Sequence, residues 1–413
     1  MENTENRTQA QILADNLGYR KTNFYEAADE AAIRAAYDYA PGYMKFLDEA
    51  KTEREASRVA IAMAEANGYV PYTFGMKTAV GGKYYYNNRG RNLYLFRIGT
   101  EPIENGVRIV AAHIDNPRVD VKQSPLYEDG GFAFFKTRYY GGIRKYQWVT
   151  IPLALHGVVI KKNGETVDVV IGEDESDPVI YINDLLPHLG QEQNQKPLGT
   201  AIPAENLNLL LGTRPFPGAD KDAIKLNILS LLNEKYGITE EDFLSADLSA
   251  VPAIRARDVG LDRSLIGAYG HDDRVCAYPS LTALFATDDS LHTSMVILAD
   301  KEEIGSEGVT GMKSAAFDTF MEDLCAAQDV PLRVCYENVI IRIENEEHDF
   351  LFHTERLTGA GNAQPEGGLI EQIGLVAHDK VVGNGVLPIV NPSAVPDFLH
   401  LKRNKYRKGF GSK

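Results

Sequence analysis

The 413-residue sequence has little cysteine and no hydrophobic run long enough to cross a bilayer. Its three cysteines, Cys276, Cys325 and Cys335, have no metal-ligand spacing, so we expect buried free thiols in a reducing compartment. A secretion signal requires a basic segment followed by an apolar one, and the sequence does not open with this pattern. These absences predict a cytoplasmic protein that has no membrane partner.

Positive charge is also scarce. The formal net charge is −15, whereas nucleic-acid binding depends on clustered Lys and Arg side chains. The one basic cluster is 402-KRNKYRKGFGSK-413, a pattern typical of a solvated tail. The charge therefore predicts that nucleic acid is not a partner.

What the sequence does contain begins with helices. Apolar positions recur at helical spacing over 28–50, where Pro41 and Gly42 predict a break. A capping box at Thr52 predicts a second helix that ends at Asn67. Aromatic and β-branched runs then predict strands at 82–88, 92–99 and 107–115.

The pattern changes near residue 125. Two strands over 149–173 are joined at Asn163-Gly164, a strong hairpin signal. An exposed loop over 189–200 and a helix around 221–236 follow, and after residue 250 the chain again alternates helix, strand and helix, with the strand at 294–300. We therefore predict an α/β fold with four segments: a catalytic domain in two parts over 1–125 and 251–338, a β-rich insertion over 126–250, and an atypical C-terminal segment over 339–413.

Three short polar segments lie where apolar strands meet loops or helices. They are 113-HID-115, 271-HDDR-274 and 302-EE-303. Imidazole and carboxylate side chains together suit zinc, and a carboxylate that bridges two ions suits a pair of metals. In combination the three segments predict a metal site with two ions.

Each segment has an expected chemical role. His113 offers an imidazole nitrogen to a metal, Asp115 orients the ring, and Asp272 can bridge two ions. One residue of the Glu302-Glu303 pair binds metal while the other takes a proton from water, because neighbours in an extended chain point in opposite directions. Taken singly, each segment also has a structural explanation: a surface or capping arrangement, an Asp272-Asp273 helix cap, or a solvated glutamate pair.

Four stretches together resemble the M18 family of zinc aminopeptidases, and within it the bacterial aminopeptidase 1 group. The stretches are 111-AAHIDNPRVDVK-122, 138-RYYGGIRKYQWVTIPLALHGVVI-160, 268-AYGHDDRVCAYPSLTAL-284 and 299-ADKEEIGSEGVTG-311. The resemblance implies a zinc-exopeptidase-like mixed sheet flanked by helices and interrupted by a β-rich insertion that mediates dimerisation. It also implies a homo-oligomer, in which dimers assemble into a dodecamer.

The resemblance further implies the role of each site residue. His113 and Glu303 each bind one metal, Asp272 bridges both, Asp115 supports His113, and Glu302 is the general base. Two Zn²⁺ ions would occupy the site, although Mn²⁺ or Co²⁺ suits the same ligands. The implied reaction is hydrolysis of the first peptide bond of a short peptide by a metal-activated water.

The resemblance stops near Asn338. Two later family ligands, an Asp within a serine-alanine-aspartate segment and a His close to the C-terminus, are not visible, which leaves each ion two protein ligands. Five residues are possible substitutes: Glu344, Glu346, Asp349, His378 and His400. One hypothesis is that residues 339–413 come from a shifted reading frame. The rivals to an active peptidase are a catalytically impaired scaffold and a dimetal deacylase.

Overall fold

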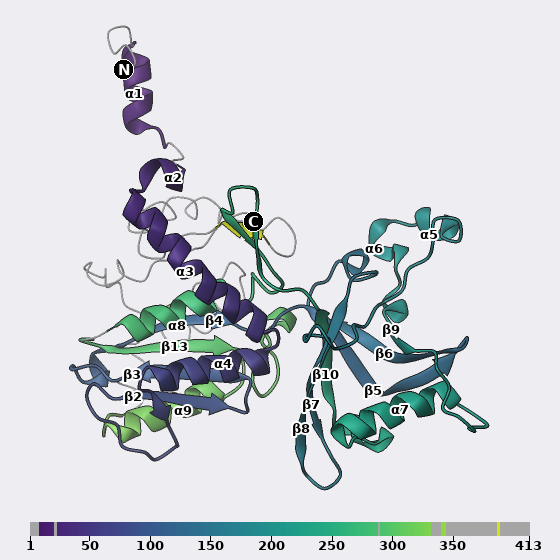
Figure 1. Cartoon of the computed structure of the whole chain (residues 1–413). Helices are drawn as coiled ribbons and strands as arrows, with labels where there is room; N and C mark the ends of the chain where they lie inside the picture. The colour runs from purple at the N-terminus through teal and green to yellow at the C-terminus, as the bar shows by residue number, and fades with distance from the viewer. Residues whose placement is uncertain (1–7, 20–22, 288–289, 332–339, 344–385, 389–413) are drawn as a thin grey trace, which may run out of the picture.

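Two six-stranded sheets organise the residues that the structure describes, which are 8–19, 23–287, 290–331, 340–343 and 386–388. In this computed structural model the sheets lie side by side, and helices α1 (Gln9–Leu17) and α2 (Phe24–Ala27) extend beyond the first of them (Figure 1). Among the described residues, no helix is both long enough and apolar enough to span a bilayer.

The first sheet, called the mixed sheet, has the strand order β1-β2-β3-β13-β4-β14. Its strands are β1 (Val70–Pro71), β2 (Lys83–Asn88), β3 (Asn92–Arg97), β4 (Val107–His113), β13 (Thr293–Ala299) and β14 (Ile340–Ile343). β13 pairs parallel with β4 and antiparallel with β3, so parallel and antiparallel strands share one sheet. The predicted mixed α/β sheet is confirmed, and so are the strands predicted from β-branched and aromatic runs.

Helices cover both faces of the mixed sheet, because its strands are apolar on both sides. Leu93 and Leu95 of β3 pack with α3 (Glu30–Glu49), α4 (Glu53–Ala66) and α8 (Ala277–Ala286). The alternate residues Tyr94 and Phe96 pack against α9 (Ala316–Ala327) on the other face. The period of two along a strand therefore supplies two cores, and Figure 1 shows the helices around the sheet.

One predicted boundary is confirmed and one predicted break is wrong. Thr52 caps α4 with a complete capping box. By contrast, α3 runs through Pro41 without a break. A Cβ at Gly42 would lie 2.3 Å from the Tyr278 hydroxyl oxygen, so Gly42 permits the Tyr278 side chain to pack closely on α3. The stabilisation from this tertiary packing outweighs the loss of the backbone hydrogen bond that Pro41 cannot donate.

The two cysteines that the structure describes differ in their state. Cys276 is half-buried and forms no disulfide, whereas Cys325, buried in α9, is disulfide-bonded. The expectation of free thiols is therefore wrong for Cys325. Sequence spacing alone does not report which cysteines the fold brings together.

The second sheet, called the insertion sheet, is antiparallel and has the strand order β8-β7-β10-β5-β6-β9. Its strands are β5 (Arg118–Asp129), β6 (Phe132–Tyr140), β7 (Leu153–Ile160), β8 (Thr166–Ile171), β9 (Leu209–Gly212) and β10 (Asp247–Pro252). Helix α7 (Ala223–Tyr236) packs against it, and the β7–β8 hairpin turns at the predicted Asn163-Gly164. The segment boundaries proposed from the sequence stay predictions.

The remaining elements are short. The predicted exposed loop over 189–200 is mostly exposed. It also contains the four-residue helix α5 (Gln191–Asn194) and most of α6 (Leu198–Ala201), which the sequence did not predict. A three-stranded sheet comprises β11 (Arg257–Val259), β12 (Leu265–Gly267) and β15 (Val386–Pro388). Single 3₁₀ turns lie at Ile103–Asn105, Lys145–Gln147, Ala204–Asn206 and Glu302–Ile304, and a six-residue 3₁₀ helix spans Glu240–Ser245.

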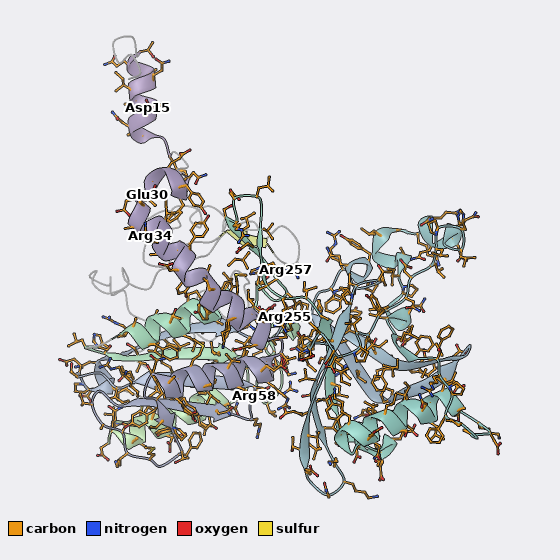
Figure 2. All side chains as sticks on the ribbon, in the orientation of Figure 1. Asp15, Glu30, Arg34, Arg58, Arg255 and Arg257 are labelled. Carbon is orange, nitrogen blue, oxygen red and sulfur yellow. The ribbon has the colours of Figure 1, made fainter. Side chains whose placement is uncertain are left out.

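Charged side chains join the start of α4 to the insertion sheet and its flanking loops. The pairs are Lys51 with Glu173 at 2.7 Å, Arg54 with Asp247 at 2.9 Å, Glu55 with His156 at 2.7 Å and Arg58 with Asp168 at 3.3 Å. Figure 2 labels Arg58 and Arg255 in this region, and Arg255 donates to the Glu173 carbonyl at 3.2 Å. This set of contacts, the charged junction, holds the insertion sheet against the mixed-sheet helices.

The buried His156 makes the charged junction sensitive to alkaline pH. Burial acts to lower the pKa of His156, but Glu173 and Glu55, each bonded to one ring nitrogen, raise it from 6.5 to about 9. A raised pKa stabilises the fold below pH 6.5, and that contribution is lost as pH rises through about 9. It corresponds to roughly 3 kcal/mol, at about 1.4 kcal/mol per pKa unit.

We therefore expect the free energy of unfolding of the wild-type chain to fall between pH 7 and pH 10 by more than that of a His156→Gln variant. Chemical denaturation across this range measures both. Parallel pH profiles for the two proteins would show that His156 does not carry this dependence.

Candidate functional site

Two strands end side by side at the candidate site. In the parallel pair of β4 and β13, Ala299 lies opposite His113, so both strands reach the same edge of the mixed sheet. The Ile114 N–H donates to the Ala299 carbonyl at 2.8 Å and continues this pairing by one residue. The segments predicted around His113 and Glu302 are therefore neighbours at the carboxyl ends of parallel strands.

Asp115 ties the two segments together. It is completely buried, and its Oδ1 and Oδ2 accept the backbone N–H groups of Glu302 and Glu303 at 3.0 and 3.1 Å. Burial acts to raise the pKa of Asp115, but the nearby His113 ring and hydrogen bonds from Tyr140 and the Glu302 amide lower it below its usual value. Asp115 is therefore an anion that holds the glutamate turn.

The ring of His113 is oriented by its neighbours. Its Nδ1 lies 3.0 Å from the backbone oxygen of Asp115, and its Nε2 lies 3.8 Å from Asp272 Oδ1. A proton on Nδ1 is donated to that carbonyl, so a metal that displaced the Nε2 proton would bind on the side of the ring that faces Asp272. Burial acts to lower the pKa of His113, but Asp115, Asp272 and Asp273 raise it well above its usual value.

Asp272 and Asp273 lie in different environments. The Asp272 side chain is 70% exposed, and its contact with His113 lowers its pKa. Asp273 is buried, its Oδ1 has no hydrogen-bond partner, and burial raises its pKa to about 7. Helix α8 begins at Ala277 with Cys276 as its N-cap, so the interpretation of the two aspartates as a helix cap is wrong.

The sequence predicts that the two glutamates lie in an extended chain, and this prediction is wrong. They form the 3₁₀ turn Glu302–Ile304, in which Lys301 and Gly305 adopt positive φ angles on either side. Glu302 is only 9% exposed and Glu303 is half-buried, so the interpretation of a freely solvated pair is also wrong. Burial and the nearby Asp273 carboxylate raise the pKa of Glu303 to about 8.

The turn after β6 contacts Glu303. Gly142 N–H lies 3.5 Å from Glu303 Oε2, and Gly141 has φ +67°. A Cβ at Gly141 would lie 2.6 Å from Glu303 Oε2, whereas a Cβ at Gly142 would meet nothing within 4 Å. Gly141 is therefore needed both for its backbone conformation and for the position of Glu303.

We expect Gly141→Ala to destabilise the fold by about 1–2 kcal/mol through its left-handed backbone, and to displace the Glu303 carboxylate. Thermal unfolding and zinc titration measure the two effects. Gly142→Ala is the matched control and should behave like the wild-type chain. Equal behaviour of the two variants would contradict this role for Gly141.

Reasoning from the sequence missed one residue of the site, Tyr140, and gave no role to Arg274 within the 271-HDDR-274 segment. Buried Arg274 donates to the carbonyls of Ala50 and Ile114, which fastens the 271–274 turn beside His113. Tyr140 donates to Asp115 Oδ2 at 2.7 Å. Both residues lie inside stretches that carry the family resemblance, and for Tyr140 that was the only signal available.

The donor chemistry of the site suits zinc, but the site is partial. An imidazole nitrogen faces a carboxylate, and the buried Asp273 has an oxygen without a partner. In the part of the chain that the structure describes, no three His, Cys, Asp or Glu side chains form a group that could hold a metal ion. The possible substitute ligands Glu344, Glu346, Asp349, His378 and His400 lie outside the described residues, as does most of the segment in the reading-frame hypothesis.

A family model and curated relatives of this chain point to the same protein family. The model of the family described as aminopeptidase I zinc metalloprotease (M18) matches residues 46–341. A probable M18 family aminopeptidase 1 of Clostridium acetobutylicum is 46% identical over 307 residues, which cover 73% of this chain and 66% of that protein. The same-named protein of Thermotoga maritima is 46% identical over 272 residues, 66% of this chain and 59% of that protein. The chain thus spans about two thirds or less of the length of these two curated relatives.

Solved structures share the fold. The crystal structure of an M18 aminopeptidase from Thermotoga maritima has a TM-score of 0.74 at 40% identity, and covers 78% of this chain and 71% of its own. Aminopeptidase I from Clostridium acetobutylicum has a TM-score of 0.71 at 39% identity, and the match covers 79% of this chain and 72% of that protein's chain. The dodecamer of S. cerevisiae mApe1, at 21% identity and a TM-score of 0.59, covers 74% of this chain and 70% of its own, and supports the fold alone.

Proposed function

Because the chain belongs to the M18 family of aminopeptidase I zinc metalloproteases, we propose that it removes the N-terminal residue from short peptides. The observation that carries this proposal is the pair of His113 Nε2 and Asp272 Oδ1, 3.8 Å apart, at the strand edge that also holds the buried Glu302. We propose that His113, Asp272 and Glu303 hold zinc, with Asp272 shared between two ions. Mn²⁺ or Co²⁺ suits the same donors.

Zinc bound at these residues would supply Lewis acidity, which polarises a peptide carbonyl and lowers the pKa of water. The chain supplies the rest of the chemistry. Glu302 takes the proton from the attacking water and delivers it to the leaving amine. Asp115 holds the Glu302 amide and the His113 ring, so that the carboxylate base and the imidazole keep a constant separation.

We also propose a homo-oligomer in which the insertion mediates dimerisation, because leucines of its 185–198 segment are exposed. These are Leu185, Leu186, Leu189 and Leu198. Exposed apolar groups of this kind mark association surfaces. The cytoplasmic location predicted from the sequence stays a prediction.

One observation favours a catalytically impaired scaffold as the second candidate. Among the described residues the site has no complete metal-binding group, and the family match ends at residue 341, close to the point where the resemblance stops. A scaffold would keep the insertion and lose the reaction. A dimetal deacylase shares the same residues but acts on N-acyl substrates.

Hydrolysis of matched peptides separates the three candidates. The purified chain is incubated with Zn²⁺ and either a short peptide with a free N-terminus or its N-acetylated form, and released amino acids and released acetate are both quantified. An aminopeptidase releases the first residue of the free peptide alone, and a chelator stops the release. Cleavage of the acetylated form alone indicates a deacylase, and cleavage of neither indicates the scaffold.

A further inference from the structure

Tyr140 reaches the candidate site from the insertion sheet. It ends β6, is 7% exposed, and donates its hydroxyl proton to Asp115 Oδ2 at 2.7 Å. Burial and the adjacent Asp115 raise the pKa of Tyr140, so the hydroxyl keeps its proton and remains a donor. A residue of the insertion sheet thus contacts the carboxylate that organises the site on the mixed sheet.

The oxygen that Tyr140 binds has two donors. Asp115 Oδ2 accepts from the Tyr140 hydroxyl and from the Glu303 N–H, whereas Oδ1 accepts from the Glu302 N–H. Hydrogen bonds between a charged carboxylate and neutral donors are stronger than those between neutral groups, and leaving a buried charge underbonded is costly. Without the hydroxyl, Asp115 Oδ2 keeps one donor and the carboxylate is less firmly oriented.

The ring of Tyr140 is held independently of its hydroxyl. The Arg118 guanidinium lies 4.1 Å from the ring centroid, in a cation–π contact, and directly opposite Tyr140 in the β5–β6 pair. Arg118 is itself fixed by Glu53 at 3.0 Å and by Asp120 at 2.9 Å. Removal of the hydroxyl should therefore leave the ring in place, which makes Tyr140→Phe a clean test of the hydrogen bond.

We propose that Tyr140 is a positioning residue, which orients Asp115 and thereby holds the Glu302–Glu303 turn and the His113 ring. The effect of Tyr140 on metal binding and catalysis rests on the proposed function. The effect of Tyr140 on the Glu302–Glu303 turn is independent of that function. The inference assigns the insertion a part in the site itself, in addition to any part in assembly.

Hydrogen exchange at the Glu302 and Glu303 amides tests the inference on the metal-free full chain. We expect these amides to exchange at least about tenfold faster in Tyr140→Phe, because their acceptor is less firmly oriented. Tyr139→Phe is the matched control: Tyr139 precedes Tyr140 in β6, is 47% exposed, and should leave exchange unchanged. Amides of α4 serve as the internal reference and should be unaffected in both variants.

Unchanged exchange at Glu302 and Glu303 in Tyr140→Phe would overturn the proposal. Equal acceleration in α4 would also overturn it, since that pattern indicates a general loss of stability. A cobalt titration, followed by absorption, then measures the consequence, with affinity expected to fall about 10- to 100-fold. If the wild-type chain binds no cobalt and cleaves no peptide, the proposed function fails, while selective acceleration in Tyr140→Phe still supports the positioning role.

Discussion

Replacement of Glu302 by glutamine is expected to lower kcat for peptide hydrolysis by about 10²- to 10⁴-fold, the usual contribution of a general base. Glutamine has nearly the same shape but cannot accept the proton from water. The Glu302 backbone N–H remains available to Asp115, so the turn should keep its conformation. Steady-state kinetics on a short unblocked peptide, with zinc in excess, measure the change.

Glu307→Gln is the matched control for this variant. Glu307 lies five residues along the same loop, is exposed, and pairs only loosely with Lys313 at 3.5 Å. It should leave kcat unchanged, and Glu302→Gln should bind zinc as the wild-type chain does. A Glu302→Gln enzyme with half or more of the wild-type kcat would show that another group accepts the proton.

The second large effect is expected from Asp272→Asn. The substitution removes the charge of the carboxylate that faces His113 Nε2, and so weakens the proposed bridge between two ions. Substitution of a residue that only supports a ligand typically lowers metal affinity 10- to 100-fold. Substitution of a ligand itself should therefore lower zinc affinity by at least about 100-fold. Isothermal titration with Zn²⁺ measures the affinity.

Asp220→Asn makes the same chemical change at an exposed position of the β9–α7 connection and should leave zinc affinity unchanged. Asp272 is mostly exposed, so its replacement should not unfold the chain, and thermal unfolding checks this. Zinc affinity within threefold of the wild-type value would rule out Asp272 as a ligand.

The strands of the mixed sheet and the start of helix α4 could be predicted from the sequence because their signals are local. The capping box at Thr52 involves residues three apart, and the apolar run before His113 reports burial on both faces of a strand. The break expected at Pro41 failed because the packing of Tyr278 on Gly42 depends on a helix more than 200 residues away.

The site was predictable in its residue types and only in part in its geometry. His113, Asp272 and Glu302 each follow or flank an apolar strand or helix, which is visible in the sequence. The burial of Asp273 and the contact of Tyr140 with Asp115 arise where the two sheets meet, and no periodic pattern reports such a contact. The 3₁₀ turn at the glutamates depends on positive φ at Lys301, a conformation uncommon for a lysine.

We propose that this chain holds zinc at the edge of the mixed sheet, between His113 and Asp272. A crystal structure with Zn²⁺ added, and anomalous data recorded at the zinc absorption edge, tests it most directly. We expect an anomalous peak about 2.0–2.2 Å from His113 Nε2 and from a carboxylate oxygen of Asp272. Saturating zinc with no peak at that position, or with peaks only elsewhere on the chain, would contradict it.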